Sequence, residues 1–307
     1  MSVAADSVRA GQIAAEAWLR ALEFPRPNGT ASLDSARAFL ESSLTAAGLD
    51  PVSLPFQCHP DRALAVAVVL LLSALLLALT KWRRSRTLAI LTLAFWIVAI
   101  GCGRGSFDFA LPARAQASLR VSVDCAAAKR REVLLLAHYD TKTEPLDHVA
   151  RTLLIAVALV SCSLAWAFLL RRRGPLTWLL PVALMALVGL AAQLALGRWL
   201  PARSSGIVDD AGACVLLADL ATQLQHTPLQ HTRVHFLWTS GEEVGAQGAA
   251  AMAQRAEIRA VDGFINLEGI GAGPDLADAG WEFGGWRLLR ADAGIRTRLR
   301  RCAARHL

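Results

Sequence analysis

Four long apolar blocks stand out along the chain, at residues 63–80, 87–103, 152–170 and 176–196. None of them contains a charged side chain. A helix of about 20 apolar residues is long enough to cross a hydrocarbon core of about 30 Å. The blocks therefore predict four transmembrane helices, in preference to four buried helices of a large soluble core.

The blocks pair into two hairpins with short, basic connectors. Residues 81–86 have the sequence KWRRSR, and residues 171–175 have the sequence RRRGP. Basic connectors of this kind face the cytoplasm under the positive-inside rule. We therefore expect the rest of the chain to lie outside the cytoplasm, although residues 1–24 do not have the pattern of a signal peptide.

Outside the apolar blocks, helical and strand-like patterns alternate. Apolar residues have helical spacing at 10–22, 32–47, 211–224 and 244–255, and strand-like runs lie at 52–56, 119–123, 132–137, 233–238 and 261–267. We place the cap of the second helix at Ser32 or Asp34. The alternation predicts an α/β fold, with a mostly parallel sheet flanked by helices as in zinc exopeptidases.

This pattern divides the chain into six segments. Residues 1–62, 104–151 and 198–272 form the α/β domain, into which the transmembrane hairpins 63–103 and 152–197 are inserted. Residues 273–307 form an atypical tail, in which 288–307 is rich in arginine and alanine and lacks strand periodicity.

Composition agrees with a membrane protein and argues against a nucleic-acid partner. Hydrophobic residues make up 54% of the chain, charged residues 19%, and the mean hydropathy is +0.40. A soluble domain does not bury that much apolar surface, so the lipid bilayer is an expected partner. The net charge is +7, but seven basic residues lie in the connectors and seven arginines in the tail. Outside the connectors and the tail, the sequence contains no stripe of basic residues interleaved with aromatic residues. It therefore does not predict a nucleic-acid-binding surface.

Acidic residues and one histidine follow the expected strands or open the expected helices. They are His138 and Asp140 after the 132–137 strand, Asp209 and Asp210 before the 211–224 helix, Glu242 and Glu243 after the 233–238 strand, and Glu268 after the 261–267 strand. Ligands of an α/β sheet bind beyond the carboxyl ends of its strands. Each motif taken singly also has an ordinary structural explanation, such as an N-cap or a solvated glutamate in a first helical turn.

Taken together, the motifs favour a zinc site. A neutral histidine binds zinc, and an aspartate two residues later can accept a hydrogen bond from its other ring nitrogen. Adjacent glutamates repel each other unless a positive charge lies nearby. Zinc supplies that charge, with one glutamate as a ligand and the other as a base for water.

With these motifs in this order, the sequence resembles the co-catalytic zinc metallopeptidases of family twenty-eight, which include leucyl aminopeptidases, glutamate carboxypeptidase and glutaminyl cyclase. The resemblance covers about residues 10–57 and 117–270 apart from the second hairpin, and includes the segment Arg26-Pro27-Asn28-Gly29-Thr30. It implies a membrane-bound, zinc-dependent exopeptidase of aminopeptidase type, with peptide substrates and two zinc ions.

The resemblance also implies a role for each motif residue. His138 is implied as a ligand of the first zinc, oriented by Asp140, and Glu268 as the remaining carboxylate of that zinc. Asp209 is implied as the bridging carboxylate and Glu243 as a ligand of the second zinc. Glu242 is implied as the general base.

Two departures from the family pattern accompany the resemblance. A hairpin separates Asp140 from Asp209, which would bring the active site close to the bilayer surface. The family's last zinc ligand is a histidine downstream of the Glu268 position, whereas here only His306 follows, without a recognisable motif. We therefore expect a truncated or frameshifted tail after about Ala272, and either two zinc ions, as the resemblance implies, or one. A catalytically impaired relative and a glutaminyl-cyclase-like transferase are the alternatives.

Overall fold

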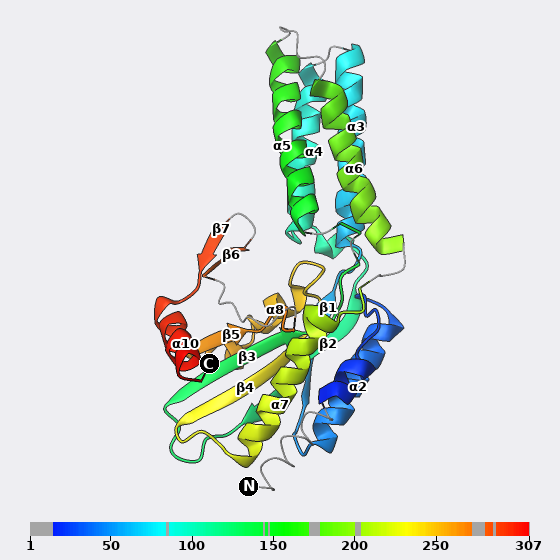
Figure 1. The fold of residues 1–307 in the computed structure, drawn as a ribbon. Helices are drawn as coiled ribbons and strands as arrows, with labels where there is room; N and C mark the ends of the chain where they lie inside the picture. Colours follow the sequence, from blue (N-terminus) through cyan, green and yellow to red (C-terminus); the bar gives the residue numbers. More distant parts are fainter. Residues whose placement is uncertain are drawn as a thin grey trace. The chain divides into compact units, whose positions relative to one another are not determined.

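The computed structural model of the protein describes residues 15–83, 86–143, 145–146, 148–171, 179–199, 204–271, 280–284 and 287–306 (Figure 1). The chain divides into two compact units, Met1–Gly269 and Ile270–Leu307. The first unit contains a five-stranded sheet, the helices of the four apolar blocks and all the residues proposed for catalysis or metal binding. Residues 84–85 of the first basic connector and 172–175 of the second lie outside the described residues.

The sheet has the strand order β1-β2-β4-β3-β5. Its strands are β1 (Val52–Cys58), β2 (Arg114–Val123), β3 (Arg131–His138), β4 (Thr232–Thr239) and β5 (Gly263–Asn266). All five expected strands are therefore present. Strand β3 is parallel to both β4 and β5, whereas β2 is antiparallel to both β1 and β4.

The sheet is mixed, and the expectation of a mostly parallel sheet was wrong. Parallel neighbours need a crossover that returns the chain to the same end of the sheet. Helix α7 (Gly212–His226) lies between β3 and β4 in the chain, and α8 (Gln247–Met252) and α9 (Ala256–Arg259) lie between β4 and β5. No helix lies between β2 and β3, and an apolar hairpin lies between β1 and β2, so the chain reverses direction at both places.

Each face of the sheet packs against helices. Trp238 on β4 is fully buried, and its indole Nε1 donates to the carbonyl oxygen of Cys214 in α7 at 3.0 Å. The next residue back along β4, Leu237, points to the opposite face because side chains alternate along a strand. There it belongs to an apolar cluster with Met252 and Ile258 of α8 and α9. The two faces of β4 are thus both buried, which explains its continuous apolar run.

Helix α2 (Ala31–Ala46) buries leucines on one face, but its cap differs from the expected one. Leu33, Leu40 and Leu44 are buried. The N-cap is Thr30, whose hydroxyl accepts the backbone N–H of Leu33 at 3.4 Å. Sequence alone placed the cap at Ser32 or Asp34, because several residues in this stretch can serve as caps. Of the helix expected at 10–22, residues 15–21 are helical and the earlier ones lie outside the described residues.

Each apolar block forms a helix, and the four helices pack together as a bundle (Figure 1). They are α3 (Arg62–Arg83), α4 (Arg86–Gly103), α5 (His148–Arg171) and α6 (Leu179–Trp199). Small side chains such as Ala67, Ala74, Ala183 and Ala191 lie in the bundle core. Two stretches, Arg62–Thr80 and Leu180–Arg198, are long and apolar enough to cross a membrane, and α4 and α5 contain the shorter apolar stretches Ile90–Gly103 and Val149–Leu164.

The second unit consists of a hairpin and a helix. Strand β6 (Trp281–Gly284) pairs antiparallel with β7 (Arg287–Arg290), and α10 (Ala293–His306) follows. Although 288–307 lacks strand periodicity in the sequence, Leu288 to Arg290 belong to β7, because a four-residue strand is too short to show a period of two. Residues 272–279, where we expect the tail to diverge, lie outside the described residues.

Candidate metal centre

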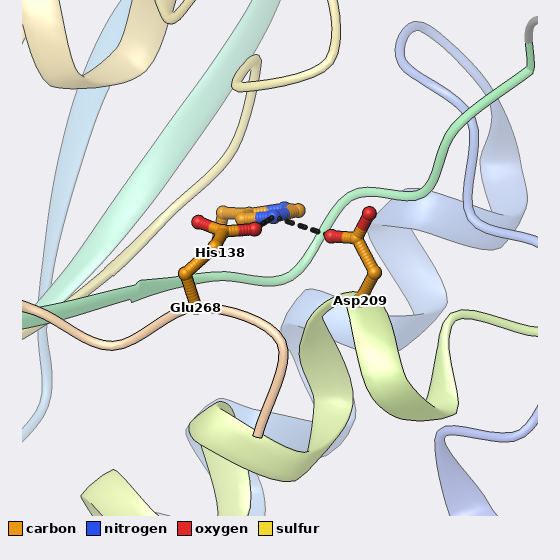
Figure 2. Close-up of side chains that lie close together, drawn as sticks. All are labelled: His138, Asp209 and Glu268. Carbon is orange, nitrogen blue, oxygen red and sulfur yellow. Dashed lines mark hydrogen bonds and ion pairs between the residues drawn. The ribbon is translucent and has the colours of Figure 1, made fainter. Parts of the chain in front are cut away.

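Three of the predicted zinc ligands converge at the carboxyl end of β3 (Figure 2). His138 is the last residue of β3, and its Nε2 atom lies 3.0 Å from Asp209 Oδ1 and 3.2 Å from Glu268 Oε1. One ligand atom from each of these residues lies within 4.8 Å of the other two. Asp209 lies in the turn before α7, and Glu268 lies just after β5. One imidazole and two carboxylates form a donor set that suits zinc.

The other ring nitrogen of His138 faces Asp140. The Nδ1 atom donates to the backbone carbonyl oxygen of Asp140 at 3.1 Å and lies 3.5 Å from Asp140 Oδ1. With Nδ1 as the donor to Asp140, Nε2 is the ring atom that would bind a metal ion; in the metal-free site Nε2 is protonated and donates towards the two carboxylates. The pKa of His138 is raised well above its usual value, because hydrogen bonds to Asp140, Asp209 and Glu268 outweigh the opposing effect of burial.

Asp140 is fully buried and accepts three hydrogen bonds, one from Asn28 and two from the turn that contains Glu242 and Glu243. Its Oδ2 atom accepts from Asn28 Nδ2 at 2.6 Å and from the backbone N–H of Glu243 at 3.0 Å. Its Oδ1 atom accepts from the backbone N–H of Glu242 at 3.2 Å. Burial alone would raise the pKa of Asp140, but hydrogen bonds from His138 and Asn28 hold it below its usual value. Asp140 is thereby placed behind the histidine and against the turn that carries both glutamates.

The turn that presents Asp209 requires a glycine. Gly206 has a φ of +68°, and a Cβ atom there would lie 2.2 Å from Thr141 Cγ2 and 2.5 Å from Arg26 Nη2. The Asp209–Asp210 peptide bond is cis. Helix α7 begins at Gly212 with Ala211 as its N-cap residue, so Asp209 does not cap this helix. Helix capping therefore does not explain the carboxylate at position 209.

Asp210 lies behind the site. It is fully buried, and its Oδ2 atom accepts the backbone N–H of His138 at 3.3 Å. Burial raises the pKa of Asp210 to about 8. In contrast, the hydrogen bond from His138 holds the pKa of Asp209 below its usual value. The two adjacent aspartates therefore have opposite protonation preferences, with Asp209 favoured as the anion.

Glu242 and Glu243 lie in the turn between β4 and α8. The helix expected at 244–255 begins only at Gln247, because Gly245 and Ala246 have positive φ angles of 95° and 51°. Burial, followed by the negative charges of neighbours that include Asp140, raises the pKa of Glu242 to about 7. Burial and the charges of Asp209 and Glu242 raise the pKa of Glu243 to about 8.

The carboxylate of Glu243 fits a cation. Among the described residues, its buried Oε1 atom has no hydrogen-bond partner. An unpaired buried carboxylate oxygen is costly, and a bound cation would compensate it. Glu243 is not part of the trio of His138, Asp209 and Glu268, and within the described part of the chain no second histidine joins that trio.

Arg26 is a structural element of the site that sequence reasoning did not single out. It is fully buried, and its guanidinium donates to the carbonyl oxygens of Tyr139 at 2.8 Å and Gly206 at 3.1 Å. Its backbone N–H donates to Thr141 Oγ1 at 2.7 Å. Arg26 therefore ties the end of β3 to the turn that carries Asp209. An arginine in a turn-rich segment usually faces solvent, so no local pattern signals this role.

Comparison with known proteins places these residues in a family. The model of the family described as Peptidase family M28 matches residues 120–291, a span that contains His138, Asp209, Glu242, Glu243 and Glu268 and continues past Ala272. No curated protein matches the chain.

Several solved structures are similar to the protein. A glutaminyl cyclase from Bacteroides thetaiotaomicron bound to N-acetylhistamine is 10% identical, with a TM-score of 0.45, over 84% of this chain and 61% of that one. A leucine aminopeptidase precursor from Bacteroides thetaiotaomicron VPI-5482 is 10% identical, with a TM-score of 0.44 and the same coverage. A glutaminyl cyclase from an Acidobacteriales bacterium is 14% identical, with a TM-score of 0.42, over 85% and 59%.

The chain thus spans about three fifths of the length of these structures. The family match covers more than half of the chain and includes every residue of the trio at the end of β3. This chain belongs to peptidase family M28.

Proposed function

We propose that the protein is a membrane-bound, zinc-dependent exopeptidase of aminopeptidase type. The observation that carries this proposal is the convergence of His138 Nε2 with the carboxylates of Asp209 and Glu268, in a chain of peptidase family M28. When bound, zinc supplies Lewis acidity towards a peptide carbonyl and lowers the pKa of a water molecule. His138, Asp209 and Glu268 would hold the first zinc ion.

Asp209 and Glu243 would hold a second zinc ion. Asp209 has two carboxylate oxygens and a depressed pKa, which suits a bridging anion. Glu243 contributes a buried carboxylate oxygen without a hydrogen-bond partner among the described residues. Its backbone N–H is held by Asp140, so the same buried aspartate orients His138 and the turn bearing Glu243.

Glu242 would act as the general base. It takes a proton from the attacking water and returns it to the leaving amine. Its pKa of about 7 in the metal-free site lies near the range in which a carboxylate both accepts and releases a proton readily. The backbone N–H of Glu242 donates to Asp140 at 3.2 Å. This hydrogen bond fixes the backbone of Glu242 and so restricts the positions that the Glu242 carboxylate can reach.

We further propose that α3, α4, α5 and α6 all span the membrane, with the catalytic part outside the cytoplasm. Each helix exposes large apolar side chains on the outer surface of the bundle, such as Leu75 at 56%, Ile97 at 65%, Val160 at 60% and Met185 at 66%. Exposed large apolar side chains on all four helices favour contact with lipid. The small residues in the bundle core are typical of helix contacts in membranes. The orientation rests on the basic connectors.

The purified protein in detergent tests the catalytic proposal. We expect zinc-loaded wild-type protein to hydrolyse leucine anilide, and the Glu242→Gln variant to lose on the order of 100-fold or more in kcat while it keeps its zinc. A peptide with N-terminal glutamine serves as the second substrate. Cyclisation of that peptide without hydrolysis of leucine anilide would indicate a glutaminyl-cyclase-like transferase. Zinc binding without turnover of either substrate would indicate an impaired relative.

A further inference from the structure

The turn that carries Glu242 and Glu243 is held from two sides. On one side, Asp140 accepts the backbone N–H groups of both glutamates. The turn is closed within itself by hydrogen bonds from the N–H groups of Gly245 and Ala246 to the carbonyl oxygen of Glu242, at 2.9 and 2.8 Å. The carbonyl oxygen of Val244 points to the other side, where residues that precede or begin α3 approach it.

Arg62, the first residue of α3, reaches this side of the turn. Its Nη1 atom lies 3.5 Å from the carbonyl oxygen of Val244. Gly245 has no side chain, and a Cβ atom there would lie only 3.0 Å from the same Nη1 atom. The guanidinium therefore packs directly against the backbone of the turn, two residues after Glu243.

The guanidinium is itself held in place. Its Nε and Nη2 atoms both donate to the carboxylate of Asp108, which follows α4, in a bidentate pair whose Nε–Oδ1 distance is 3.1 Å. A Cβ atom on Gly105 would lie 2.6 Å from Arg62 Nη2, so this side of the guanidinium is also tightly packed. Only 12% of the Arg62 side chain is exposed. A bidentate pair fixes the plane of an arginine as well as its position.

Gln247 supports the same carbonyl group. Its Nε2 atom donates to the carbonyl oxygen of Val244 at 2.9 Å and to that of His59 at 3.2 Å, and its Oε1 atom accepts the backbone N–H of His59 at 2.8 Å. The stretch from His59 to Arg62 thus contacts Val244 both directly and through Gln247. This stretch leads straight into α3.

We propose that Arg62 is a positioning residue: from the start of α3 it holds the Glu242–Gly245 turn in the orientation that presents both glutamates to the metal centre. The base of the first apolar hairpin is then part of the catalytic framework as well as an anchor. The catalytic consequence rests on the peptidase function proposed above. The mechanical role of Arg62 does not, so the two can be tested separately.

Arg62→Met removes the donors and keeps much of the apolar stem. Hydrogen exchange of the full chain in detergent, followed by mass spectrometry, reports the opening of the 241–247 turn. We expect exchange there to become at least about tenfold faster in Arg62→Met. We also expect kcat for leucine anilide to fall about tenfold or more with little change in KM, because the base and the metal ligand are displaced.

Arg198→Gln is the matched control. It removes an ion pair at the same junction, between Arg198 Nε and Asp61 Oδ1 at 2.5 Å, without touching the turn. Exchange at 241–247 and kcat should stay near wild type. If Arg62→Met does not fold, Arg62→Lys takes its place, since a lysine cannot pair in a bidentate way with Asp108 and reach Val244 together.

Unchanged exchange at 241–247 in the Arg62 variant would overturn the proposal. Faster exchange with an unchanged kcat would overturn its catalytic part. If wild-type protein turned over neither substrate, the peptidase proposal would fail, and exchange alone would still decide whether Arg62 holds the turn.

Discussion

The backbone N–H of Glu243 donates to the carboxylate of Asp140 at 3.0 Å, although the two residues are separated by 102 other positions. The same carboxylate faces His138. One buried charge therefore positions the end of β3 and the turn after β4. The site is organised around Asp140, although Asp140 itself is not expected to touch a metal ion.

Asp140→Asn should weaken the site far more than the loss of one charge suggests. The carboxylate accepts hydrogen bonds from Asn28 and from two backbone N–H groups. In the asparagine variant, the side-chain NH₂ group would face one or more of these donors and could not accept a hydrogen bond from them. We expect zinc affinity to fall about 10–100-fold and unfolding free energy to fall by about 1–3 kcal/mol. Competition with a chelator and thermal unfolding measure the two effects.

Asp219→Asn is the control for this change, because Asp219 is an exposed aspartate on α7 that bonds only with Gln223 among the contacts the structure describes. It should leave zinc affinity and stability close to wild type. Equal effects of the two substitutions would contradict the role assigned to Asp140.

Gly206→Ala should disrupt the turn that carries Asp209. The substitution combines a positive φ with a Cβ atom 2.2 Å from Thr141 Cγ2, so the end of β3 or the turn must shift. Gly48→Ala provides a matched control, because Gly48 has a φ of +79° and no atom within 4 Å of its Cβ position. We expect Gly48→Ala to cost about 1–2 kcal/mol from backbone strain alone.

Gly206→Ala should cost clearly more than Gly48→Ala and should also abolish tight zinc binding. Denaturant unfolding and metal analysis of both variants make the comparison. Similar losses of stability, with zinc retained in both, would show that packing around Gly206 does not hold the site.

The sequence was sufficient to predict where the candidate residues lie but not what holds them. Periodicity and strand ends predicted five strands, four apolar helices and the placement of His138 and Glu268 at the carboxyl ends of neighbouring strands. These features repeat over several residues, so a local pattern reveals them. Arg26 and Arg62 act through single contacts with residues far along the chain, and such contacts leave no local pattern.

The two incorrect predictions, of the strand directions and of the start of α8, also arise from contacts between residues far apart in the chain. The mixed strand directions depend on which connections contain a crossover helix packed on the sheet, and residue patterns do not show how the apolar hairpin connects β1 to β2. The late start of α8 depends on the left-handed conformation of Ala246, a residue with high helix propensity. Tertiary contacts of the turn, with Asp140 and Arg62, override that propensity.

Reporter fusions test whether α3 and α4 both cross the membrane. Alkaline phosphatase is active only outside the cytoplasm, so in a bacterial host a fusion after residue 85 should be inactive and a fusion after residue 125 active. Fusions after residues 174 and 206 should give the same alternation for α5 and α6. Activity at both members of a pair would contradict a hairpin that spans the membrane.

The metal-free protein should lose stability as the pH rises from about 6 to 8. Glu242, Glu243 and Asp210 have pKa values of about 7, 8 and 8, all raised first by burial. In this window the folded chain keeps protons that the unfolded chain has already released, so stability falls as pH rises. The raised pKa of His138 acts in the same direction, since stability present below its unfolded pKa is lost as pH rises through the folded one. The lowered pKa values of Asp140 and Asp209 act only at more acidic pH.

Zinc should reverse this dependence, because its ligands bind as deprotonated groups and binding releases their protons. Thermal unfolding in detergent with a chelator should therefore show a loss on the order of 5 kcal/mol between pH 6 and 8, and the stabilisation by added zinc should grow over the same range. Glu243→Gln removes one of the titrating groups and should make the chelated profile flatter. If the chelated protein became more stable towards pH 8, these carboxyl groups would already be ionised in the folded state. Their pKa values would then not be raised by burial, and the proposed role of Glu242 as a general base with a pKa of about 7 would be contradicted.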